Sequence, residues 1–282
     1  MTKLIECPRD AMQGLHEFIP TATKAEYINI LLKVGFDTID FGSFVSPTAI
    51  PQLKDTAEVL DKLDLSSGSS KLLAIVANLR GVQDAVRHEQ ITYLGFPFSV
   101  SESFQQRNTH SSIAQSLNTV AEMLNLCNKH NKQAVIYLSM GFGNPYDDEW
   151  SYEIVEHWTG KLSELGVKIL SLADTTGVST PENINYLFPH LASRFPEVEF
   201  GVHLHSNPES RLEKIDAAWQ SGCKRFDTAL KGYGGCPMAA DDLTGNIATE
   251  NLISFLSAQG EDPGLDMDKW QEALVFSSTV FS

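Results

Sequence analysis

Short runs of β-branched and apolar residues alternate with longer amphipathic segments along all 282 residues of the chain. Eight of the runs have the length and composition of buried strands: 3–7, 37–41, 71–77, 91–96, 133–139, 167–173, 198–205 and 225–230. Helical spacing lies between them, as in 23–34, where Ala25, Ile28 and Leu31 share one face. This α/β alternation predicts a single (β/α)8 barrel, the TIM barrel, over residues 1–282.

A doubly wound open sheet is the alternative arrangement for the same alternation. It usually carries a glycine-rich phosphate fingerprint after its first strand, and the chain has none there. No long Pro/Gly/Ser linker divides the chain into two domains. Helix signals agree with the pattern: we expect N-caps at Thr21 or Thr23, at Ser111 and at Thr180, and a terminating glycine at Gly35. The barrel is therefore favoured.

Composition narrows the class of partner. The net charge of −15 argues against nucleic acid, because a phosphate backbone needs a basic surface. No apolar run approaches the roughly 18 residues of a membrane span. The four cysteines lack C-x-x-C spacing, and the N-terminus lacks a secretory or transit signature. We therefore expect a cytoplasmic protein with a small-molecule substrate, bound to neither nucleic acid nor membrane.

Polar side chains gather where the predicted strands end. Active sites of such barrels lie at the carboxyl ends of the strands, where the fold itself does not require polar groups. The candidates are Arg9 and Asp10 after the first strand, Asp40 in the second, Asp174 after the sixth, His203 and His205 in the seventh, and Cys236 and Asn246 after the eighth. We expect an active-site loop around residues 231–246.

Each candidate also has a structural interpretation. Arg9 and Asp10 could form a local salt bridge, and Asp174 before Thr-Thr-Gly could cap a turn. Cys236 could be a small hydrophobe, and Asn246 a turn residue. The two histidines, on one face of a strand, are equally consistent with a metal site and with a solvated edge.

Taken together, Asp10, His203, His205 and Asn246 offer one carboxylate, two imidazoles and one amide oxygen. A mixed nitrogen and oxygen set without a thiolate suits Mg²⁺ or Mn²⁺ with open positions for water or substrate. Zn²⁺ is a less favoured alternative that the two histidines permit. The sequence therefore predicts a divalent metal site at the barrel mouth.

Several motifs extend this pattern along the chain in a fixed order. They are P-R-D-A-M-Q (8–13), S-F-V-S-P (43–47), A-D-T-T-G-V (173–178), H-L-H (203–205), G-Y-G-G-C-P (232–237) and G-N-I-A-T-E-N (245–251). With them the chain resembles the 3-hydroxy-3-methylglutaryl-CoA (HMG-CoA) lyases. This family belongs to a metal-dependent barrel superfamily that also contains the isopropylmalate and citramalate synthases.

The resemblance implies a retro-Claisen cleavage of a 3-hydroxyacyl-CoA, with acetyl-CoA and acetoacetate as the products from HMG-CoA. It implies that Asp10, His203, His205 and Asn246 hold the divalent ion. It implies a catalytic Arg9 that stabilises the thioester enolate and a catalytic Cys236 that supplies the proton. Asp40 and Asp174 match further catalytic positions, Gln13 matches a substrate-binding position, and a homodimer is expected.

The chain also departs from the family pattern. The family has glutamate where this chain has Asp40, and aspartate where it has Ser206, followed here by Asn207 and Pro208. These changes leave the predicted metal ligands intact and alter the surroundings of the acyl group. Two alternatives follow: a related lyase or aldolase for another acyl-CoA, hydroxy acid or keto acid, and a non-catalytic barrel that binds metal or ligand. No short motif encodes a CoA site; Arg80 and Arg107 are candidates for its phosphates.

Overall fold

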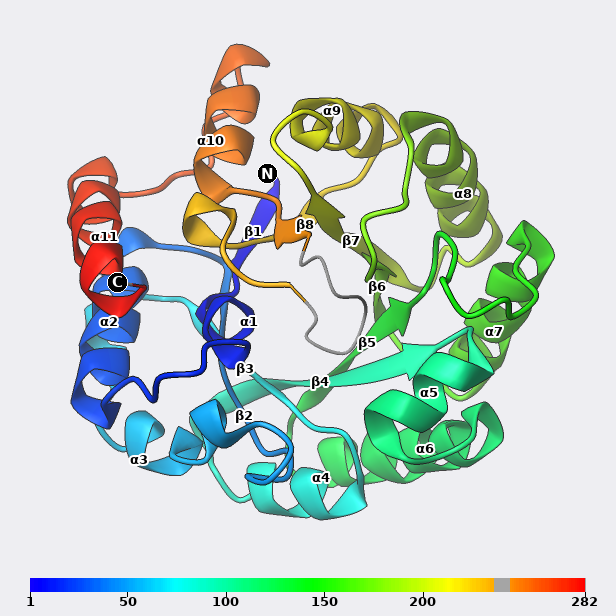
Figure 1. The fold of residues 1–282 in the computed structure, drawn as a ribbon, viewed down its shortest axis with the longest axis horizontal. Helices are drawn as coiled ribbons and strands as arrows, with labels where there is room; N and C mark the ends of the chain where they lie inside the picture. The colour runs from blue at the N-terminus through cyan, green and yellow to red at the C-terminus, as the bar shows by residue number, and fades with distance from the viewer. Residues whose placement is uncertain (236–243, 282) are drawn as a thin grey trace.

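The structure is a computed structural model, and it describes residues 1–235 and 244–281. A parallel sheet closes on itself, because β6 pairs with β7 as well as with β5. Figure 1 shows it from one end, surrounded by helices. The parallel strands are β1 (Lys3–Glu6), β2 (Thr38–Ser43), β3 (Lys71–Ile75), β4 (Ile91–Ser99), β5 (Gln133–Ser139), β6 (Ile169–Asp174), β7 (Glu199–Ser206) and β8 (Arg225–Thr228).

The helices follow the strands in alternation. They are α1 (Pro8–Gln13), α2 (Thr21–Val34), α3 (Thr56–Leu60), α4 (Leu79–Ala85), α5 (Glu102–Thr109), α6 (Ile113–Lys129), α7 (Tyr152–Glu164), α8 (Pro181–Arg194), α9 (Arg211–Gln220), α10 (Thr249–Ala258) and α11 (Met267–Val280). Short 3₁₀ turns cover Pro51–Leu53, Leu65–Ser67 and Leu230–Gly232. Among the described helices, none combines the length and the apolar character needed to cross a membrane.

The sequence-based prediction of eight strands in a closed barrel is confirmed, and the open doubly wound sheet is wrong. Helix signals were less accurate. Thr180 caps α8 with a capping box, and Gly35 ends α2 at a φ of 94°. The cap of α6 is Ser112 rather than Ser111, and α2 begins at Thr21 itself after Pro20. Neighbouring hydroxyl residues are interchangeable in a sequence pattern, but only one reaches the free N–H groups.

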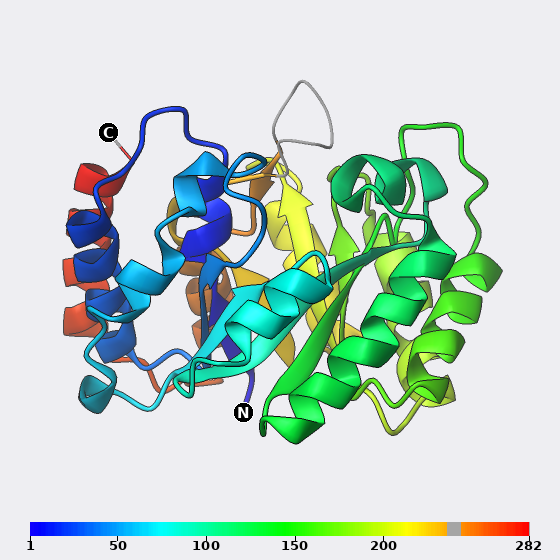
Figure 2. The ribbon, with the colours of Figure 1, turned by 90° about the horizontal axis from the view of Figure 1, so that it is seen from below.

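The large hydrophobic core lies between the outer face of the barrel and the helices. A second, smaller cluster fills the barrel itself: Leu73, Tyr93, Val135, Tyr137 and Ile169. Gly95 makes this filling possible, since a Cβ there would lie 2.9 Å from the ring of Tyr137. The barrel is thus a packed interior, and a site can form only at its mouth. Figure 2 shows the N-terminus at the end opposite to that mouth.

A buried carboxyl group joins the two segments that enter and leave the loop after β8. Glu6, at the end of β1, accepts a hydrogen bond from the backbone N–H of Leu230 at 2.8 Å. Its second oxygen lies 2.6 Å from the hydroxyl of Thr249, which in turn lies 2.9 Å from that of Thr228. Burial raises the pKa of Glu6 to about 8, although Thr249 and Leu230 lower it in part.

The raised pKa of Glu6 predicts a pH-dependent contribution to stability. Since the folded state holds this proton more tightly than the unfolded chain, the contribution is full below the unfolded pKa of about 4.5 and is lost as pH rises towards 8. Glu6→Gln mimics the neutral acid. We expect the free energy of unfolding of the native protein, minus that of the variant, to fall by up to roughly 1.4 kcal/mol per pH unit in this range. Urea unfolding between pH 5 and 9 measures it; a constant difference would contradict the assignment.

Candidate metal centre and active-site pocket

Helix α1 places Arg9 and Asp10 directly beyond the end of β1. Pro8 occupies its first turn, where the missing N–H costs nothing. The guanidinium of Arg9 donates to Asp40 Oδ2 from Nε (2.9 Å) and Nη2 (2.5 Å), and from Nη1 to Asp10 (2.8 Å) and Gln13 (2.9 Å). Gln13 also donates to Asp10 at 2.8 Å. Arg9 is therefore held between the carboxylates of Asp10 and Asp40, which fix the orientation of its guanidinium from both sides.

The two histidines lie next to Asn246 because of a strand pairing that the sequence pattern did not reveal. Gly245–Asn246 forms β9, antiparallel to β7, with His205 opposite Asn246. The amide of Asn246 donates to Asp10 Oδ2 at 2.7 Å and to the carbonyl of Tyr233 at 2.8 Å. The Nε2 atoms of His203 and His205 lie 3.3 Å apart. All four predicted ligands thus come together.

The geometry of these residues fits a divalent cation. Ligand atoms of Asp10, His203 and His205 lie within 4.8 Å of one another. The buried Oδ1 of Asn246 has no hydrogen-bond partner among the described residues, so an acceptor is available at the same place. Asp227 Oδ2 lies 3.3 Å from Nδ1 of His203 and turns Nε2 towards the other ligands. These residues could hold a hard or borderline ion.

The charges of the centre support the same interpretation. Burial would raise the pKa of Asp10, but Arg9, His203 and His205 outweigh it and lower the pKa to about 2. Burial and the neighbouring His203 lower the pKa of His205 to about 4. Burial also disfavours the charged form of His203, yet the hydrogen bond to Asp227 makes the net shift of its pKa upward. Asp10 and His205 are accordingly in the ionisation states that bind a cation.

Asp40 and Asp174 lie behind the centre rather than in the pocket. Burial raises the pKa of Asp40 to about 6 despite Arg9, and its side chain is fully buried. Asp174 accepts hydrogen bonds from the backbone and hydroxyl of Ser179 (3.0 and 2.5 Å) and from Lys214 (2.9 Å). The sequence neighbours of Asp174, Ala173 and Thr175, line the pocket, whereas Asp174 itself does not. Both carboxylates orient other residues in this arrangement.

Lys214 is a buried residue of the site that the sequence pattern does not predict. It lies on α9 with its ammonium donating to Asp174, to the carbonyl of Gly177 and to the carbonyl of His205, each at 2.9 Å. One cation thereby connects the ends of β6 and β7. A lysine in an amphipathic helix is normally solvated, so the local pattern does not predict this role.

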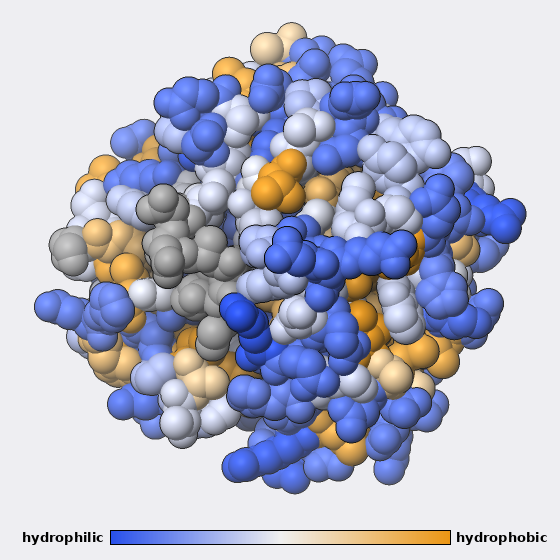
Figure 3. All heavy atoms as spheres, turned by 45° about the vertical axis from the view of Figure 1, so that its right-hand side comes forward, coloured by the Kyte–Doolittle hydropathy of each residue, from blue (hydrophilic) through white to orange (hydrophobic). Residues whose placement is uncertain are grey.

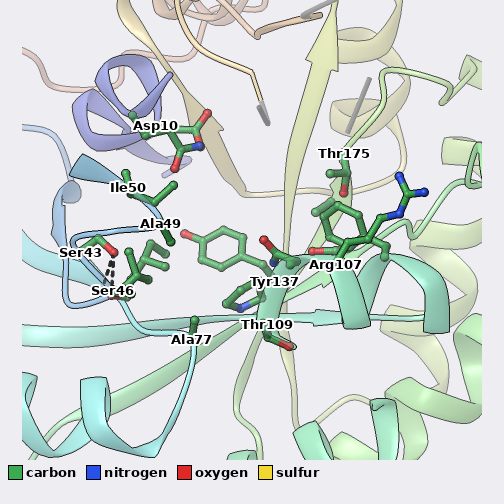
Figure 4. Close-up of a pocket in the computed structure, with 18 of the residues that line it drawn as sticks. Asp10, Ser43, Ser46, Ala49, Ile50, Ala77, Arg107, Thr109, Tyr137 and Thr175 are labelled. Atoms are coloured by element: carbon green, nitrogen blue, oxygen red, sulfur yellow. Dashed lines mark hydrogen bonds between the residues drawn. The ribbon is translucent and has the colours of Figure 1, made fainter. Parts of the chain in front are cut away.

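A pocket of about 460 Å³ opens beside the predicted metal ligands. Arg9, Asp10, His203 and His205 line one end of it. Figure 4 shows Ser43, Ser46, Ala49 and Ile50 on one side of the pocket, Arg107 and Thr175 on the other, and Tyr137 between them. The ring of Tyr137 meets that of His203 edge-on at 5.6 Å.

The two arginines that are candidates for the CoA phosphates differ in their position relative to the pocket. Arg107 lines the pocket and lies over the ring of Tyr146 at 4.6 Å. Arg80 is not among the lining residues, and its side chain is 90% exposed. Hydrophilic side chains dominate the face in Figure 3, with smaller hydrophobic groups between them. Cys236, the predicted proton donor, lies outside the described residues.

Comparisons with known proteins find similarity over nearly the whole barrel. A family model described as HMGL-like matches residues 4–276. A cytoplasmic 3-hydroxy-3-methylglutaryl-CoA lyase of Rattus norvegicus is 33% identical over 96% of this chain and 78% of its own length. A 3-hydroxy-3-isohexenylglutaryl-CoA/hydroxymethylglutaryl-CoA lyase of Pseudomonas aeruginosa is 32% identical over 94% and 88%. An HMG-CoA lyase of Acinetobacter baumannii, solved with coenzyme A and 3-methylmalate, has a TM-score of 0.90 at 31% identity and covers 97% of this chain and 89% of its own.

The ion pair of Lys214 predicts a large loss of stability on substitution. Lys214→Met leaves Asp174 as a buried, uncompensated carboxylate, so we expect a loss of about 3 kcal/mol in the free energy of unfolding. Lys161→Met is the matched control, because Lys161 pairs with Glu164 on the surface and should contribute under about 1 kcal/mol. Urea denaturation followed by circular dichroism compares the two. Equal losses in both variants would show that the buried pair contributes nothing special.

Proposed function

The chain belongs to the HMGL-like family, and from this premise we propose that it cleaves HMG-CoA into acetyl-CoA and acetoacetate. It is a lyase with an activity like that of the HMG-CoA lyases, given full-length relatives of that name at about a third identity. The single observation that carries the proposal is the convergence of Asp10, His203, His205 and Asn246 at one end of the pocket, with Arg9 beside them.

Divalent-metal dependence is a property of this family, and the ligand cluster of the chain is consistent with it. We propose Mg²⁺ or Mn²⁺ in preference to Zn²⁺, because Asp10 and Asn246 contribute hard oxygen donors beside the two imidazoles. A bound divalent ion would supply Lewis-acid chemistry, lowering the pKa of a chelated hydroxyl group and fixing its orientation.

Arg9 has the position and the rigidity to stabilise negative charge on the acyl group. Its guanidinium lines the pocket and is held by Asp40, Asp10 and Gln13, so it need not reorganise as charge develops on the thioester enolate. We assign Asp40 a positioning role through Arg9, and Asp174 a positioning role through Lys214. Gln13 lines the pocket and can contact the substrate.

The proton that completes the enolate as acetyl-CoA needs a donor. We propose Cys236 for this step, from the resemblance of the G-Y-G-G-C-P motif. Two residues before it, Gly234 has a φ of 99°, and a Cβ there would come within 2.8 Å of the carbonyl of Asp10. A side chain at position 234 would therefore displace the loop from the metal ligands.

An acyl-CoA ester is the class of substrate that the relatives favour, and the Acinetobacter baumannii enzyme was solved with coenzyme A. We propose that Arg107, at the pocket rim, contacts the polar part of this substrate. We further propose a cytoplasmic location and a homodimer. Binding of nucleic acid or of a membrane is not part of the proposal.

A second substrate is favoured by the walls of the pocket. Val45, Ile50 and Phe104 contribute apolar surface to the pocket lining, which suits a larger apolar group on C3 of the acyl chain. The relative from Pseudomonas aeruginosa carries such a substrate in its name, an isohexenyl analogue. The same bond is cleaved in both cases, so the two proposals differ only in the group that the pocket accepts.

Incubation of the purified protein with HMG-CoA and Mg²⁺ or Mn²⁺, with measurement of acetoacetate, tests the proposal. We expect metal-dependent product and its loss by at least about a hundredfold in Asp10→Asn, which keeps the shape of the side chain but removes a ligand charge. Lys161→Met, at a surface ion pair with Glu164, is the control and should retain activity. The absence of acetoacetate at full metal occupancy would refute HMG-CoA as substrate.

A further inference from the structure

A buried arginine lies inside the barrel on the side away from the pocket mouth. Arg225 begins β8 and is 1% exposed. Its side chain enters the barrel because β7 offers Gly201, where a Cβ would lie 2.9 Å from both Cγ and Cδ of the arginine. Its guanidinium carbon lies 5.7 Å from the ring centre of Tyr93, one of the residues that fill the barrel.

The guanidinium of Arg225 has no hydrogen bond to any described residue from Nε, Nη1 or Nη2. Its nearest ionic neighbour is Glu199, 3.8 Å from Nη1, and Glu199 is already bound to Lys3 at 2.7 Å. Burial alone would lower the pKa of Arg225, but Asp227 ahead of all other groups raises it, and the net direction is upward. Because arginine stays protonated in proteins, Arg225 is a buried cation without a hydrogen-bonded counter-ion among the described residues.

Other unpartnered polar atoms occupy the same part of the interior. Tyr137 and Ser171 are paired in register across β5 and β6, and Ser171 is paired with Gly201 across β6 and β7. The hydroxyls of Tyr137 and Ser171 and the Oδ1 atom of Asp227 are buried with no hydrogen bond to a described residue. Buried polar groups of this kind are normally joined by ordered water, which makes about three hydrogen bonds each.

We propose that Arg225 is a positioning residue for the metal centre, acting on His203 through Asp227 by its charge. The inference rests on the metal site that belongs to the proposed function. Arg225 and Asp227 are two residues apart in one strand and so face the same interior. His203 is the register partner of Asp227, and its Nδ1 is the atom that Asp227 contacts.

Each step of this chain has a physical effect on the next. The cation of Arg225 shares the barrel interior with the buried carboxylate of Asp227 and offsets part of the cost of burying that charge. The carboxylate holds the proton of His203 on Nδ1, which leaves the lone pair of Nε2 free for a cation. Without Arg225, the carboxylate is uncompensated and the orientation of the imidazole is no longer fixed. Loss of such an outer contact typically weakens metal binding ten- to a hundredfold.

The affinity for Mn²⁺, measured by calorimetry without substrate, tests the proposal. We expect Arg225→Met to raise the Kd at least about tenfold, and Arg225→Lys to recover most of the loss because it keeps the charge. Glu199→Gln is the control: it removes the other ionic neighbour of Arg225 and should leave the Kd unchanged. A folded Arg225→Met protein with the native Kd would overturn the proposal.

A double variant covers the case in which Arg225→Met alone does not fold. Arg225→Met/Asp227→Asn removes both charges and leaves no unpaired carboxylate. We expect it to bind Mn²⁺ as Asp227→Asn alone does, because Arg225 acts through Asp227. A further tenfold loss in the double variant would refute this route. Since no substrate enters either measurement, failure to cleave HMG-CoA would contradict the proposed function and leave this inference standing.

Discussion

Three carboxylates are buried together at the carboxyl end of the barrel, and their mutual repulsion determines the rest of the site. Asp10, Asp40 and Asp227 cannot all be ionised in a dry interior unless cations face them. Arg9, on the first helix, forms ion pairs with Asp40 and Asp10, and Arg225 lies two residues before Asp227 in β8. The remaining negative charge, with two imidazoles beside it, is the condition for binding a divalent ion.

Much of the fold, and the group of polar residues that meet at the barrel mouth, could be predicted from the sequence. Eight buried strands and the polar residues at their ends follow from periodicity and from the position of active sites in such barrels. The pairing of Asn246 with His205 could not be predicted, because a two-residue strand has no periodicity. Helix α1 was also missed, since six residues are too few for a helical pattern.

The residues that orient the centre were the least predictable. Lys214 and Arg225 are long, charged side chains of types that are seldom buried, and their burial depends on partners far along the chain. Arg225 needs Gly201 of another strand to enter the barrel, and Lys214 needs carbonyl groups at the ends of β6 and β7. Such dependence on register and packing is invisible in a local pattern. Of the three orienting residues, only Asp227 could be suspected from the local pattern, because it is an acid in an otherwise buried strand.

In the proposed function, the reaction and the choice of substrate depend on different parts of the molecule. We assign bond cleavage to the ligand cluster and Arg9, and the selection of the acyl group to the apolar lining residues Val45, Ile50 and Phe104. A crystal grown with Mn²⁺ and measured at the manganese absorption edge tests the shared basis directly. We expect one strong anomalous peak between Asp10, His203, His205 and Asn246. A peak between Cys7, His203 and Asp227, the second buried group of possible ligands, or no peak at the four ligands, would contradict the metal centre described here.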